Sequence, residues 1–135
     1  MNLYDNDDGK RRFTLDEANR VLPDLISATE KIVTGLEILR KKHDIDVDMR
    51  LENANQEFQK EASQLLASWS KQVADLGAYP KGYFVVDFMS KVPGTLLCWT
   101  FGEYKIMHTH KIFEKFKHRR PIRDEINIGF EYSLN

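Results

Sequence analysis

The chain lacks paired cysteines and any excess of charge of one sign. Cys98 is the only cysteine among 135 residues, so no disulfide bond can form within the chain. This excludes the disulfide-rich secreted scaffolds, which need paired cysteines. The 20 Lys and Arg residues nearly balance the 21 Asp and Glu residues, for a formal net charge of −1. A chain with this balance has no overall attraction to nucleic acid or to an anionic membrane.

Long apolar runs are also missing. No stretch approaches the roughly 20 apolar residues that a membrane-spanning helix needs, and residues 1–12 are polar, without the apolar centre of a signal peptide. We therefore expect a cytoplasmic protein with no membrane contact. The length suits a single domain with its own core. We assign that domain to residues 13–122, between a flexible N-terminus over 1–12 and a C-terminal tail over 123–135.

Apolar residues recur at helical spacing in the first half of the domain. One stretch predicts a helix over about 14–42, in which Thr14 and Glu17 have the spacing of a capping box. Pro23 lies inside this stretch and removes a backbone donor, so we expect a kink or break near 20–23.

A second stretch predicts another helix over about 46–77, with Gly77 as its C-terminal cap. The polar run over 43–48 predicts a turn between the two. Amphipathic helices joined in this way predict a long antiparallel hairpin.

The composition changes after Gly82. Three segments rich in β-branched and aromatic residues follow, separated by SKVPG and by the turn at Gly102-Glu103. They predict a three-stranded antiparallel meander over 83–110. The fold class is therefore α+β, with the helical hairpin capped at one end by the small sheet.

Asp87 and Cys98 are unusual within these apolar strands. In one interpretation Asp87 points outward while residues 84, 86 and 88 face the core. In the other, it pairs with His110, Arg119 or Arg120 at the sheet surface.

Cys98 has the sequence context of a small buried hydrophobe. For nucleophilic chemistry it would need an activating base, a role that His110 could fill if the strands pair suitably.

His108 and His110 stand two residues apart, so both point to one face of a strand. That geometry is able to bind zinc, but a complete site would need a third ligand such as Asp87, Glu103 or Cys98. No spacing specifies that third ligand. We therefore assign no metal and no cofactor from the sequence.

Residues 111–123 carry Lys or Arg at six positions against one acid, Glu114. Together with Phe113 and Phe116 they could bind phosphates and stack on bases. The spacing of the two phenylalanines is explained more simply as the buried side of a short helical turn. Since no nucleic-acid-binding motif is present, the sequence disfavours nucleic acid as a partner.

The chain resembles the bacterial family catalogued as domain of unknown function 2203. The resemblance is carried by FTLDEANRVLP at 13–23 and by a later series of matching positions. These are Asp87-Phe88, Leu97-Cys98-Trp99, Gly102-Glu103, Ile106, His110 and Arg119-Arg120-Pro121-Ile122. The chain departs from the family pattern at Met89, Thr109 and Lys115, where the family has Pro, Trp and Gly. His108 falls where the family pattern has no histidine.

The resemblance implies a fold of helices plus a small sheet and no known activity. It also implies that a group of polar residues is special, namely Asp87, Glu103, His110, Arg119 and Arg120. We interpret this polar cluster first as a structural charge network.

The expected function is a non-enzymatic module that self-associates or binds a protein partner, with a homodimer formed through the helical stripes. One alternative is an enzyme or small-ligand binder that uses Asp87, Glu103, His110 and Arg120. The other is a nucleic-acid-binding protein that uses residues 111–123.

Overall fold

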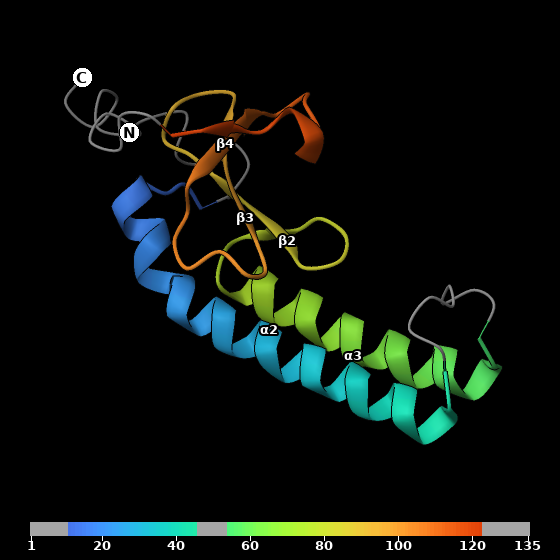
Figure 1. Ribbon diagram of the computed structural model, residues 1–135. Coiled ribbons are helices and arrows are strands. Elements are labelled where there is room, and N and C mark those ends of the chain that lie inside the picture. Colours follow the sequence, from blue (N-terminus) through green and yellow to red (C-terminus); the bar gives the residue numbers. More distant parts are fainter. Residues whose placement is uncertain (1–10, 46–53, 123–135) are drawn as a thin grey trace.

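The structure, a computed structural model, describes residues 11–45 and 54–122. Helix α2 (Leu15–His43) and helix α3 (Gln56–Asp75) lie side by side. The sheet covers the end of this hairpin where α2 begins and α3 ends (Figure 1). The predicted α+β class is therefore correct. None of the helices in the described part of the chain is long and apolar enough to cross a membrane.

The N-terminus of α2 is fixed by the predicted capping box. The Thr14 hydroxyl accepts from the Glu17 backbone N–H at 3.0 Å, and the Glu17 carboxylate accepts from the Thr14 N–H at 2.9 Å. The kink or break expected near 20–23 is not matched, because one continuous helix contains Pro23. Pro23 is exposed, while Leu22 and Leu25 beside it are buried in the core. The backbone hydrogen bond that Pro23 cannot donate thus lies on the solvent-facing side of α2. Core packing of the neighbouring residues keeps the helix continuous before and after the proline.

Helix α3 is shorter than predicted. It begins at Gln56 rather than near 46, with the Asn55 side chain accepting from the Phe58 N–H at 2.8 Å. The predicted turn over 43–48 is described only as far as Ile45, where Asp44 has a left-handed backbone. At the other end, Gly77 has φ of 91° and donates to the Ala74 carbonyl, as expected of a helix-ending glycine.

The sheet has five strands instead of the predicted three. They pair antiparallel in chain order: β1 (Tyr79–Pro80), β2 (Val85–Met89), β3 (Thr95–Thr100), β4 (His108–Lys111) and β5 (Arg120–Pro121). The three longer strands correspond to the predicted meander. Each of the two missed strands is two residues long and contains a proline. Neither therefore shows an alternating pattern in the sequence, and proline is tolerated because both strands lie at the edges of the sheet.

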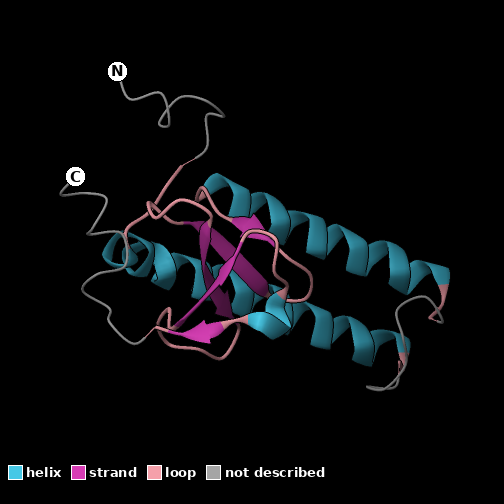
Figure 2. Cartoon of the chain, turned by 90° about the horizontal axis from the view of Figure 1, so that it is seen from above, coloured by secondary structure: helices cyan, strands magenta, loops and turns pink. Residues whose placement is uncertain are grey.

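The main core lies between one face of the sheet and the sheet-proximal halves of the helices (Figure 2). Val86, Phe88, Leu97 and Trp99 provide the sheet side of this core. The described positions of the helical stripes are buried or half-buried within the same chain, and Ile38 is the one large apolar side chain exposed on α2 and α3. The described parts of α2 and α3 therefore present no exposed apolar stripe of the kind that the predicted homodimer would use.

The N-terminal segment is attached to the sheet. The Phe13 N–H donates to the Met89 carbonyl at 2.8 Å, and the Lys91 N–H donates to the Phe13 carbonyl at 3.1 Å. Arg11 donates from Nη1 to the Leu76 carbonyl at 3.1 Å. Of the predicted flexible N-terminus, residues 1–10 lie outside the described residues, as does the predicted tail over 123–135.

The prediction that Phe113 and Phe116 form the buried side of a helical turn is wrong. Phe113 is 87% exposed and Phe116 is 43% exposed. The only helical turn in this region is a short 3₁₀ helix, η2 (Phe116–His118), which begins after Phe113. Because Phe113 lies outside this turn, the spacing of three does not place the two rings on one helical face.

Candidate functional site

A row of polar side chains crosses the sheet on the face opposite the main core. The register places Tyr79 opposite Asp87, Asp87 opposite Cys98, and Cys98 opposite His108. Directly paired residues of antiparallel strands share a face, so all four side chains lie on the same side of the sheet. His110 follows His108 by two residues and therefore joins this face.

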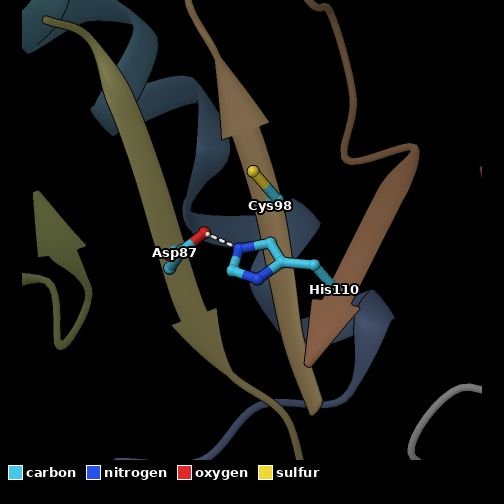
Figure 3. A group of neighbouring side chains, drawn as sticks. All are labelled: Asp87, Cys98 and His110. Atoms are coloured by element: carbon cyan, nitrogen blue, oxygen red, sulfur yellow. Dashed lines mark hydrogen bonds and ion pairs between the residues drawn. The ribbon is translucent and has the colours of Figure 1, made fainter. Parts of the chain in front are cut away.

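Asp87 and His110 form a buried pair between β2 and β4 (Figure 3). The His110 Nε2 atom lies 3.0 Å from Asp87 Oδ1, and the two residues are 4% and 3% exposed. On the other side of the ring, Nδ1 lies 2.8 Å from the Lys111 carbonyl oxygen. A carbonyl only accepts, so Nδ1 carries a hydrogen. A second hydrogen must lie between Nε2 and the carboxyl, because two bare acceptors would repel each other.

Cys98 completes this group from the central strand β3. Its thiol is fully buried, and one ligand atom each from Asp87, Cys98 and His110 lie within 4.8 Å of one another. Burial, and next the negative charge of Asp87, raise the pKa of Cys98 to about 12. The thiol is therefore protonated at neutral pH. This disfavours the nucleophilic role considered from the sequence, since the thiolate is the reactive form.

The protonated, buried thiol leads to a direct prediction about reactivity. At about pH 8 the metal-free native protein should not react with an aromatic disulfide reagent, whereas the urea-unfolded chain should react at once. Following the release of the coloured thiol product measures both rates. Rapid stoichiometric labelling of protein with an unchanged circular dichroism spectrum would contradict the buried placement of Cys98.

A second polar group lies at the outer part of the sheet. Arg119 donates from Nη2 to both carboxylate oxygens of Glu103, each at 2.8 Å, and lies 2.7 Å from Nδ1 of His108. A guanidinium only donates, so Nδ1 of His108 accepts this bond. Glu103 also accepts from the Thr100 N–H at 2.9 Å. The group thus fastens the turn after β3 to the segment before β5.

Arg120 points elsewhere and binds Glu114 on the surface. Its Nη1 and Nη2 atoms donate to the two Glu114 carboxylate oxygens at 2.8 and 2.5 Å. The bonds from Arg120, followed by the hydrogen bond from the Lys111 backbone N–H, lower the pKa of Glu114 to about 2. The carboxylate therefore stays ionised, and Arg120 neutralises it.

The structure thus divides the predicted polar cluster into separate groups. Asp87 and His110 meet in the buried pair, Glu103 and Arg119 meet in the outer group, and Arg120 belongs to neither. Sequence reasoning did not assemble Asp87, Cys98 and His110 as one group, and it missed Glu114 as the partner of Arg120. Alternation along the strands already places Asp87 and His110 each on a definite face. The missing information was the register that brings Cys98 beside both.

Asp87, Cys98 and His110 have the chemistry of a metal-ligand set. Carboxylate, thiolate and imidazole together suit zinc and related transition metals rather than magnesium or calcium. His110 also has the supporting contact typical of such ligands, because its Nδ1–H is held by a backbone carbonyl while Nε2 faces the other two donors. His108 does not share this arrangement, since its Nδ1 atom is engaged by Arg119.

Comparison with known proteins identifies a family but no activity. No curated protein and no solved structure shows a match to the chain. One protein family does match, over residues 11–122, and its description is Uncharacterized conserved protein (DUF2203). This range contains both polar groups and every described strand. The chain therefore belongs to the family of domain of unknown function 2203, as its sequence motifs indicated.

Proposed function

We propose that this protein binds a divalent transition-metal ion of the zinc class through Asp87, Cys98 and His110. The observation that carries the proposal is the convergence of three different donor atoms within 4.8 Å, each from a different strand. A bound ion would connect β2, β3 and β4 across the face of the sheet opposite the main core. Three protein donors leave one position of a tetrahedral ion for water or an external ligand.

Charge balance supports a doubly charged ion at this site. The Asp87 carboxylate and a Cys98 thiolate contribute two negative charges, and a neutral His110 contributes none. A 2+ ion with these ligands gives a site with no net charge, which is the condition for stable burial away from water. In the metal-free protein, one hydrogen lies on the thiol and another is shared by the buried pair. When the metal binds, these two protons leave and one 2+ ion takes their place, so the net charge of the site does not change.

The test uses the full chain after removal of metal with a chelator. Cobalt(II) should produce the intense near-ultraviolet band of a thiolate–metal bond, and zinc should displace it. Zinc should also raise the unfolding temperature, since an excess of about 100-fold over Kd adds about 2.7 kcal/mol to the free energy of unfolding. Titrations followed by absorbance and by differential scanning calorimetry measure both effects.

The matched control exploits the two histidines of β4. Cys98→Ser should remove the thiolate band and His110→Gln should weaken metal binding by at least about ten-fold, whereas His108→Gln should bind as the wild type does. Circular dichroism of each metal-free variant establishes that it is folded. The proposal fails if cobalt gives no thiolate band with the wild type, or if His108→Gln weakens binding as much as His110→Gln.

A further inference from the structure

The segment that runs from the last residue of β4 through η2 exposes apolar side chains that the fold does not bury. In this apolar–basic loop, defined as residues 111–118, Phe113 is 87% exposed, Ile112 is 53% exposed and Phe116 is 43% exposed. These three large apolar side chains are exposed within five residues of one another, and exposed apolar surface gathered in one place marks an interaction site. From the sequence, Phe113 and Phe116 were predicted to be buried, and their exposure in the structure rules out that role.

The same loop carries positive charge that is not neutralised locally. Lys111, Lys115 and Lys117 are exposed, and the one acid of the loop, Glu114, is occupied by Arg120. Within the part of the chain that the structure describes, neither Lys115 nor Lys117 forms an ion pair. The loop therefore presents a local positive surface on a protein whose overall charge is close to zero.

The loop is held in a defined conformation by polar contacts. The Glu114 carboxylate accepts from the Lys111 N–H at 2.8 Å, and the Ile112 N–H donates to the Gly94 carbonyl at 3.0 Å. The Arg119 guanidinium, fixed by Glu103, lies 4.6 Å from the centre of the Phe116 ring. The Phe116 ring is therefore already ordered and loses little conformational freedom when a partner stacks on it.

We infer that the apolar–basic loop binds single-stranded nucleic acid, with unpaired bases stacking on Phe113 and Phe116 and the lysines contacting phosphates. Exposed rings among basic side chains are the pattern used for single strands, because every base has a flat face that can stack. The stacked guanidinium of Arg119 extends the same surface. This inference does not require the proposed metal site, although the loop begins at Lys111, directly after His110.

A lipid surface fits the loop less well. The ion pair of Glu114 and Arg120 lies within and beside the loop, and inserting Phe113 into an acyl layer would draw these charges out of water. Beside a nucleic acid strand the pair can stay hydrated. A duplex also fits less well, because the short loop offers neither an α-helix nor a two-stranded ribbon to enter a groove.

The experiment measures fluorescence anisotropy of a labelled oligouridine RNA of about 12 nucleotides with the purified full chain. We expect binding at about 50 mM salt that weakens steeply at about 200 mM. Phe113→Ala should reduce the affinity about five-fold or more. Lys115→Ala/Lys117→Ala should make the slope of log affinity against log salt shallower by about 1.4, corresponding to two phosphate contacts on a single strand.

Matched controls replace the same residue types elsewhere on the surface. Tyr83→Ala removes another exposed ring, and Lys31→Ala/Lys60→Ala removes two exposed helix lysines. Both should bind the RNA as the wild type does. The inference is overturned if the RNA does not bind at low salt, if Phe113→Ala leaves the affinity unchanged, or if a duplex of equal length binds as tightly. Binding to vesicles of anionic phospholipid with no binding to RNA would also overturn it.

Discussion

Replacing Phe13 by alanine is expected to lower the free energy of unfolding by about 3–5 kcal/mol, which is the usual cost of removing a fully buried phenylalanine. The Phe13 side chain is completely buried in the main core. Its ring meets Phe88 edge to face with centroids 5.1 Å apart, and the Arg11 guanidinium lies 4.2 Å from the ring centre on another side. Alanine would therefore leave a cavity where the N-terminal segment joins the helices to the sheet.

The backbone contacts of Phe13 do not depend on its side chain. Its N–H and carbonyl bond to Met89 and Lys91, so the alanine variant should keep the native arrangement while losing stability. Urea denaturation followed by circular dichroism measures the change. Phe113→Ala is the matched control, because that ring is exposed and its removal should change stability by less than about 0.5 kcal/mol. Similar losses for the two variants would contradict the assignment of Phe13 to the core.

Helices and their ends could be predicted from the sequence because the relevant interactions are local. Apolar spacing defined the buried face of α2, and the spacing of Thr14 and Glu17 defined its start. Pro23 shows the limit of local reasoning. The cost of an interior proline is a local quantity, whereas the packing of Leu22 and Leu25 that outweighs it depends on the tertiary structure.

Strand pairing was less predictable because it depends on partners distant in the sequence. The alternation of residues 85–89 already shows that Asp87 and Val86 face opposite sides, and the structure agrees. Which residue lies beside Asp87 is set by the offset between strands, on which the sequence pattern carries little information. The adjacent Arg119 and Arg120 illustrate the same difficulty. Successive residues of an extended segment point in opposite directions, so the two arginines bind different carboxylates.

Removing either partner of the Asp87–His110 pair should be strongly destabilising. The pair is almost completely buried, so Asp87→Val or His110→Leu alone leaves an unpaired polar group in the protein interior. Losses of about 3–5 kcal/mol are typical when one member of a buried pair is removed. Urea denaturation of the metal-free proteins measures these values, so that metal binding does not contribute to the comparison.

Replacing both partners together should have a much smaller effect. In Asp87→Val/His110→Leu, two apolar side chains of suitable size occupy the space, and no charge remains buried. Such replacements are often neutral or stabilising. The Lys111 carbonyl loses its donor from Nδ1, at a cost of about 0.5–1.5 kcal/mol. We therefore expect a stability within about 1.5 kcal/mol of the wild type.

This comparison separates a structural pair from a functional one. If the double variant is as stable as the wild type but no longer binds zinc, the fold does not require Asp87 and His110, and metal binding accounts for their presence. If the double variant instead loses about as much stability as either single variant, the fold requires the pair itself, and the pair acts as the structural network first inferred from the sequence. Additive losses would instead show that Asp87 and His110 contribute independently, because the effects of residues in direct contact fail to add.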